Sequence, residues 1–132
     1  MPGIAFCLPN FPAADHRAAN LHQFFSKYKC PEPHNEDAYV QAANTYNLDY
    51  RLLPSISLQE STCGKHYRLS NYWGWNSART GFESVPSGID YVSRQLAEGK
   101  YYKDKSIKDK LRSYNPEPSY TVKIMRLMGE IE

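Results

Sequence analysis

Apolar side chains recur at spacings of three and four residues along most of this chain, with polar residues between them, as amphipathic helices require. Leu21, Phe25 and Tyr28 share one such face near the start of the chain. Met125 and Met128, together with Val122, are expected to point toward a core near its end. The pattern as a whole predicts helices over residues 15–29, 35–47, 49–63, 87–99, 106–114 and 119–132.

Several of these helices carry start and stop signals. Ser106, with Asp109 three residues later, is a variant of the capping box. Asp49 is expected to cap the third helix, and Gly64 to take the left-handed conformation that closes it. Pro54 lies inside that helix and is expected to bend it or to shift its start.

Residues 68–86 interrupt the helical pattern. The stretch "NYWGWNSARTGFESV" separates aromatic residues with Gly, Asn and Ser, which favours short strands and tight turns. We therefore expect a small β-hairpin and loop lobe here, within an α+β fold that is predominantly α-helical. Residues 15–132 are expected to form a single domain, preceded by an N-terminal extension over residues 1–14.

Composition and charge exclude several classes of protein. Of the 132 residues, 41% are hydrophobic and 14% aromatic, which argues against disorder. The net charge is only +2, and the four lysines between residues 103 and 110 are interleaved with two aspartates, as on a solvated helix surface. We therefore expect no nucleic-acid partner. No apolar run reaches the roughly 20 residues that span a bilayer, so no membrane span is expected.

Cysteine and histidine residues suggest one covalent link and no metal. Three cysteines permit at most one internal disulfide. Cys63 is expected either to pack or, if the protein is exported, to bond to Cys30, and we take the Cys30–Cys63 pair as a hypothesis because both residues flank helices that are expected to meet. The histidines show no metal-ligand spacing, so neither a metal nor a cofactor is expected; they are His16, His22, His34 and His66. A thiol nucleophile at Cys63 is disfavoured because no histidine is placed by the sequence to activate it.

The stretch "LQESTCGK" contains the strongest candidate for chemistry. Glu60 shares a helix face with Leu53 and Ile56, and it lies in the last turn, where the helix dipole is negative. Both apolar surroundings and the dipole raise the pKa of a carboxyl, which suits a general acid. The alternative is a surface residue that pairs with Lys65 or His66.

The neighbouring motifs carry a family resemblance. The segments "LDYRLLPSISLQESTCGKH", "NYWGWNS" and "LRSYNPEPSYTVKIM" resemble the lysozyme-like superfamily of peptidoglycan-cleaving enzymes, in particular bacterial glucosaminidase and soluble lytic transglycosylase domains, over residues 36–130. The resemblance implies that Glu60 is the acid and forms a Glu-Ser pair with Ser61. It implies that Asn71 to Trp75 form one wall of the cleft, and that Tyr114 and Asn115 lie across from the acid. Tyr114 is a candidate catalytic residue that could hydrogen-bond Glu60 or the sugar, and on periodicity alone it could equally be a core residue below Leu111. A Gly-Leu-Met-Gln motif of many transglycosylases is missing, which favours the glucosaminidase-like branch.

A glycosidase also needs to stabilise the positive charge that develops on the sugar. Glu83 is the candidate second carboxylate, although it could instead pair with Arg79 on the surface. The resemblance implies another route, in which the substrate's own N-acetyl group or 6-hydroxyl assists, and we favour that route.

Aromatic and amide side chains of the predicted lobe could hold the sugar. Tyr72, Trp73 and Trp75 are candidate stacking surfaces, and Asn71 and Asn76 candidate partners for acetamido groups. Either tryptophan could instead be a core residue of the small lobe.

The sequence thus predicts a domain that cleaves β-1,4 glycosidic bonds of peptidoglycan strands, with chitin oligomers as another possible substrate. The alternative is a non-catalytic wall-binding or assembly module. A monomer is expected, and the resemblance implies a periplasmic or extracellular location, with any export signal outside this chain.

Overall fold

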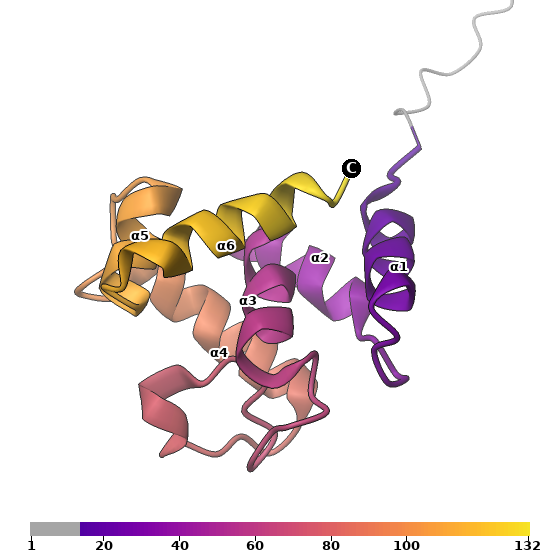
Figure 1. Cartoon of the computed structure of the whole chain (residues 1–132), viewed down its shortest axis with the longest axis horizontal. Helices are drawn as coiled ribbons and strands as arrows, with labels where there is room; N and C mark the ends of the chain where they lie inside the picture. Colours follow the sequence, from indigo (N-terminus) through magenta and orange to yellow (C-terminus); the bar gives the residue numbers. More distant parts are fainter. Residues whose placement is uncertain (1–13) are drawn as a thin grey trace, which may run out of the picture.

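The computed structural model describes residues 14–132 of the chain, and this part is built of helices and loops (Figure 1). The N-terminal extension predicted for residues 1–14 therefore lies, apart from Ala14, outside the described residues. The helices are α1 (Arg17–Lys27), α2 (Glu36–Tyr46), α3 (Leu52–Ser61), the short 3-10 helix η1 (Trp75–Ala78), α4 (Val85–Glu98), α5 (Ile107–Tyr114) and α6 (Pro118–Gly129). Every predicted helix is present, with ends that differ from the prediction by a few residues.

α3 is the central helix of the fold. Its residues 52–57 are all buried, because neighbouring helices cover it on several sides. α6 crosses it directly, and α2 packs against both α1 and α4 (Figure 1). Pro54 stands in the first turn of α3, where a missing backbone N–H costs no helical hydrogen bond, so the proline moves the helix start and does not break it.

The amphipathic pattern locates the buried faces of most helices. In α4, Ile89, Val92 and Leu96 are buried as expected, and Gly99 ends the helix. In α5, the Ser106 side chain accepts a hydrogen bond from the Asp109 backbone N–H at 3.2 Å, which confirms the predicted cap.

In α6 the predicted core face is partly wrong. Met128 is buried as predicted, but Val122 is 69% exposed, and the core also contains Tyr120, Ile124 and Leu127. These three residues follow the same helical spacing but a face rotated from the one predicted. The larger side chains occupy the core, and Val122 is left in solvent.

The predicted β-hairpin does not form in residues 62–84. The structure has a single bridge there, between Arg68 and Asn71, followed by the 3-10 helix η1. Strands need extended backbone, but Leu69, Ser70 and Asn76 have φ values of 55°, 59° and 54°. The segment is therefore a lobe of turns, and it extends beyond the C-terminal end of α3 (Figure 1).

The predicted disulfide between Cys30 and Cys63 is present, with a Cα–Cα distance of 5.6 Å. It joins the loop after α1 to the turn that follows α3, so it anchors the start of the turn lobe. A bond that closes a loop of this size typically stabilises a fold by about 2–4 kcal/mol.

Among the described helices, none combines the length and the apolar character that a bilayer crossing demands.

Candidate active-site cleft

Glu60 lines a cleft of about 690 Å³. The end of α3 forms its floor, and residues 74–80 form one wall. The other wall comes from α4, from the loop at residues 99–102 and from the end of α5. α3 stops one residue after Glu60 because Thr62 takes a left-handed conformation, with φ of 52°. The glutamate is thus carried by a rigid helix. It is exposed, although Leu53 and Ile56 on the same helix face are buried.

Burial raises the pKa of the Glu60 carboxyl, although the side chain is accessible from the cleft. The carboxyl forms no salt bridge among residues 14–132, so no cation offsets this effect. Tyr120 opposes the rise, since its hydroxyl is close enough to favour the ionised form, but the two groups do not form a hydrogen bond of normal geometry. The cleft therefore contains a carboxyl that retains its proton to higher pH than a solvated glutamate.

Gly74 brings the turn lobe into contact with this carboxyl. Its φ is +64°, and a Cβ atom at this position would lie 3.1 Å from Glu60 Oε2. Both the left-handed backbone and the closeness of the carboxylate favour glycine at this position. The lobe thus packs its backbone, with no intervening side chain, against the candidate acid.

Aromatic rings of the cleft lining pack against one another. The Trp75 ring lies 5.8 Å from the Tyr102 ring and 5.9 Å from the Tyr114 ring, measured between centroids, and it meets Tyr91 edge-on at 6.3 Å. Tyr114 also stacks on Tyr120, with an interplanar angle of 5°. Because each ring is supported by others, Trp75 is held in one orientation and presents a flat surface.

Tyr114 lines the cleft as predicted, but it is not bonded to Glu60. Its hydroxyl donates a hydrogen bond to the backbone carbonyl of Trp73, and burial raises the pKa of this phenol well above its ordinary value. It therefore fastens α5 to the turn lobe and stays neutral. Asn115 also lines the cleft, while its side-chain oxygen accepts a hydrogen bond from the Glu117 backbone N–H at 3.0 Å.

Trp73 does not line the cleft, contrary to the prediction. It is fully buried, and its indole N–H donates to the Tyr39 hydroxyl at 3.3 Å. In an extended strand, Trp73 and Trp75 would lie on one face. The left-handed Gly74 between them turns the two side chains apart, so Trp73 is the core residue of the lobe.

Asn71 is also a structural residue and not a cleft residue. Its amide N–H groups donate to the carbonyls of Trp75 and Thr80 at 2.9 and 3.0 Å, and its carbonyl accepts from the Trp75 backbone N–H at 3.0 Å. Because these bonds occupy the buried amide, Asn71 shapes the lobe and is not free to bind an acetamido group.

Three further predicted residues lie outside the cleft lining. Ser61 is buried and accepts a hydrogen bond from the Gly64 backbone N–H at 2.9 Å, so it closes the end of α3. The Tyr72 ring lies against Gly64 and the Tyr67 ring, 4.8 Å away between centroids. Glu83 is exposed and forms neither a cleft wall nor a salt bridge with Arg79 in the described structure.

Sequence reasoning missed the wall opposite the lobe. Tyr91 and Gln95 reach the cleft from α4, and Lys100, Tyr101 and Tyr102 reach it from the loop that follows. The one signal was the "GKYY" stretch directly after the helix stop, where two adjacent aromatics stand outside any helical pattern. Of the predicted amide partners, Asn76 lines the cleft, and it donates to Thr80 Oγ1 at 2.9 Å.

The charges of the cleft are few. Among the described residues that line it, Glu60 is the only carboxylate and Lys100 the only cation. The cleft therefore supplies only one of the two carboxylates that a mechanism with two facing carboxylates requires.

Comparison of the chain with known protein families, curated proteins and solved structures found no match.

Proposed function

We propose that this protein cleaves β-1,4 glycosidic bonds between N-acetylated sugars, with peptidoglycan strands as the substrate and Glu60 as the general acid. The observation that carries the proposal is the position of Glu60 in the 690 Å³ cleft, with a raised pKa and no cationic partner. A carboxyl that stays protonated can deliver its proton to a leaving-group oxygen, which glycoside cleavage requires.

The first step transfers the Glu60 proton to the glycosidic oxygen while the bond from the sugar C1 to that oxygen breaks. The positive charge that develops at C1 must be compensated on the other side of the ring. Since the cleft contains no second carboxylate, the substrate's acetamido oxygen or its 6-hydroxyl bonds to C1. In the 6-hydroxyl route, Glu60, now ionised, takes the proton of that hydroxyl as its oxygen bonds to C1 and leaves an anhydro end. In the acetamido route it takes a proton from a water molecule whose oxygen bonds to C1 while the bond from C1 to the acetamido oxygen breaks. Either transfer restores the acid.

The aromatic walls supply the binding surface for the sugar. Pyranose rings present C–H groups that pack on aromatic faces, and Trp75 with its supporting tyrosines offers such a face beside Glu60. Asn76 on the rim offers amide groups for an acetamido substituent. The cleft volume of about 690 Å³ lies within the range of about 300–1,000 Å³ that is typical of small-molecule sites.

The wider setting follows from the same proposal. We propose membership of the lysozyme-like superfamily, in a form with turns where the sequence predicts a hairpin. An enzyme that cleaves the bacterial cell wall acts outside the cytoplasm, where the Cys30–Cys63 disulfide would be stable. We expect it to act as a monomer.

The test is mass spectrometry of the soluble products after purified peptidoglycan is incubated with the wild-type protein and with Glu60→Gln. Fragments that depend on Glu60 support the enzyme, and their ends identify the reaction: anhydro-muramyl ends for a transglycosylase, reducing sugars for a hydrolase. Chitin oligomers in a parallel incubation show whether the muramyl residue is needed.

A non-catalytic wall-binding module is the second candidate, and the single carboxylate of the cleft favours it. In that case folded wild type releases no fragments over a range of pH and wall types, yet it still sediments with peptidoglycan. Trp75→Ala then abolishes the sedimentation, because both candidates use the same aromatic face.

A further inference from the structure

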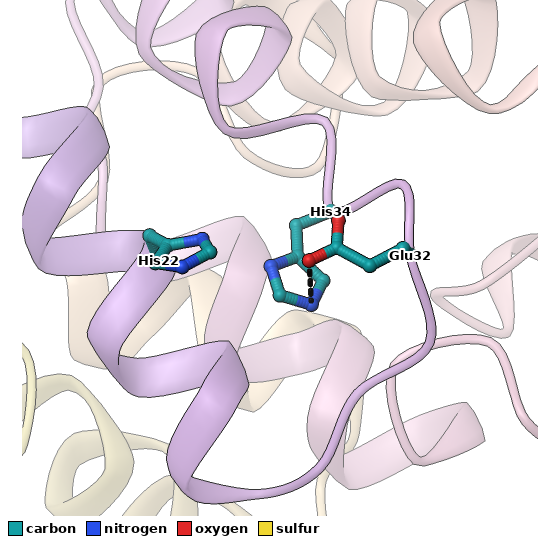
Figure 2. A group of neighbouring side chains, drawn as sticks. All are labelled: His22, Glu32 and His34. Carbon is teal, nitrogen blue, oxygen red and sulfur yellow. Dashed lines mark ion pairs between the residues drawn. The ribbon is translucent and has the colours of Figure 1, made fainter.

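A second group of reactive side chains lies beside α1, outside the cleft. His22 on α1 and the loop residues Glu32 and His34 each place one potential ligand atom within 4.8 Å of those of the other two (Figure 2). We propose that these three residues bind a divalent transition-metal ion, with Zn²⁺ as the best fit. The sequence shows no such site because its ligands come from a helix and a loop, at spacings that match no zinc motif.

The donor atoms are of the kind that zinc prefers. Two imidazoles and one carboxylate form a borderline-soft set, which suits Zn²⁺ better than Mg²⁺ or Ca²⁺. Glu32 Oε1 lies 3.6 Å from His34 Nε2. Two ligands of one tetrahedral zinc ion, each roughly 2.0–2.2 Å from the metal, are about 3.4 Å apart, so this pair is already near the required spacing.

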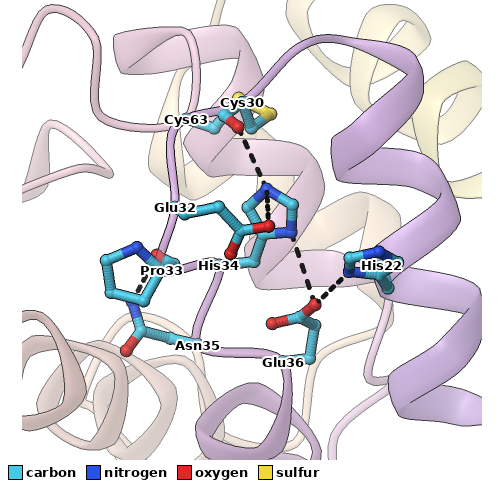
Figure 3. A network of polar contacts seen from close by, with 8 residues as sticks. All are labelled: His22, Cys30, Glu32, Pro33, His34, Asn35, Glu36 and Cys63. Carbon is cyan, nitrogen blue, oxygen red and sulfur yellow. Dashed lines mark hydrogen bonds and ion pairs between the residues drawn. A yellow bond between two sulfur atoms is a disulfide. The ribbon is translucent and has the colours of Figure 1, made fainter.

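Glu36 orients both imidazoles. Its Oε2 atom lies 2.8 Å from His22 Nδ1 and 3.3 Å from His34 Nδ1 (Figure 3). A carboxylate on the second ring nitrogen is the usual partner of a metal-bound histidine, because it sets the tautomer and the ring angle. His34 Nε2 faces Glu32 and also donates a hydrogen bond to the Cys30 carbonyl oxygen, which is 3.0 Å away. Metal binding at Nε2 displaces this proton and replaces the hydrogen bond.

Burial and charge fit the same site. The His34 side chain is only 3% exposed, so one ligand is held firmly, while His22 and Glu32 are exposed and can move onto the ion. The two carboxylates, Glu32 and Glu36, carry a charge of −2 next to two imidazoles, and one divalent cation neutralises it. The ion would fasten the loop after α1 to the helix, beside the Cys30–Cys63 bond.

The test is zinc binding by the untagged full chain after removal of metal with a chelator. Isothermal titration with Zn²⁺, together with equilibrium dialysis and metal analysis, is expected to give one ion per chain. Zinc should also raise the melting temperature, and EDTA should reverse the increase. Co²⁺ in place of Zn²⁺ should give visible absorption bands of a histidine-carboxylate site.

The variants are chosen so that folding is preserved. His22→Gln and Glu32→Gln change exposed side chains and should each weaken zinc binding about tenfold or more, while Glu36→Gln should weaken it about 10- to 100-fold. His66→Gln, an exposed histidine outside the cluster, should bind zinc as the wild type does. Circular dichroism confirms that each variant is folded.

Two results would overturn the proposal. One is a folded wild type that binds no zinc at micromolar to millimolar concentration. The other is unchanged binding in the double variant His22→Gln/Glu32→Gln, which would place the ion elsewhere. In either case the cluster is a hydrogen-bonded histidine network that stabilises the loop without metal.

Discussion

The turn lobe has two sides with nearly the same residue types and different environments. On the core side, Asn71 and Trp73 are buried and hydrogen-bonded. On the cleft side, Trp75 and Asn76 are partly or fully exposed beside Glu60. One tryptophan and one asparagine lie on each side, so the residue type does not decide whether a side chain is structural or faces the cleft. The hydrogen-bond partners and the burial of each side chain decide it. Groups whose hydrogen bonds are completed inside the protein stabilise the lobe, and groups left open to the cleft are available to a ligand.

Glu60 belongs to the open side and gives the largest expected effect on function. Glu60→Gln keeps the shape of the side chain but removes the transferable proton, so glycan cleavage should fall about 10²–10⁴-fold while binding of the glycan is retained. The rate of fragment release and the affinity for an oligosaccharide measure the two quantities separately. Glu83→Gln is the matched control and should keep nearly full activity; equal losses in the two variants would contradict the assignment.

The tryptophans should respond in opposite ways to the same substitution. Trp73→Ala removes a fully buried side chain and should lower the free energy of unfolding by about 3–5 kcal/mol. Trp75→Ala should lower it far less, but should weaken glycan binding severely. Urea denaturation and oligosaccharide titration of both variants test this pair. If Trp73→Ala were as stable as Trp75→Ala, the division of the lobe into two sides would be wrong.

The asparagines repeat the comparison at a smaller scale. Asn71→Ala leaves the Trp75 and Thr80 carbonyls without their donor and should cost about 1–3 kcal/mol of stability. Asn76→Ala removes one exposed hydrogen bond and should change stability by less than about 0.5 kcal/mol. Thermal and urea unfolding of the two variants measure these changes in stability. If both variants remain folded, the affinity for glycan should fall in Asn76→Ala and not in Asn71→Ala.

The smallest effect concerns the dependence of stability on pH. Because the pKa of Glu60 is raised in the folded protein, its contribution to stability is fully present below the ordinary value of 4.5 and is lost as pH rises through the folded value. Glu60→Gln has no proton to lose, so it should equal the wild type near pH 4 and become more stable than it toward pH 7. Unfolding curves at several pH values check this. If the difference in unfolding free energy between Glu60→Gln and the wild type shrank with rising pH, it would argue against burial of the carboxyl.

The same pKa also predicts the direction of the activity profile. A general acid must be protonated, so activity should decline as pH rises through the pKa of Glu60, at higher pH than an ordinary carboxyl would give. The wild type should show this decline of activity with rising pH, and the residual activity of Glu60→Gln should not show it.

Helix periodicity made much of the fold predictable. The buried face of α4, the cap at Ser106 and the position of Glu60 in the last turn of α3 all follow from short-range spacing, because a helix relates residues three and four apart by a constant geometry. The Cys30–Cys63 pairing could be predicted for the same reason, because both residues follow helices that the spacing predicts. Val122 shows the limit: its spacing was right, but which of two neighbouring apolar stripes is buried depends on the packing partner.

What the sequence determined by itself was therefore the set of helices and the presence of one carboxylate where α3 ends. The tertiary structure decided which residues surround that carboxylate: it turned Trp73 into the core and Trp75 into the cleft, and brought Tyr102 and Lys100 to the opposite wall. It also brought His22 to His34 and Glu32. The physical reason is that the lobe and the loops have no repeating backbone geometry. The direction of each side chain there depends on individual φ values and on contacts between distant segments, which no local spacing in the sequence encodes.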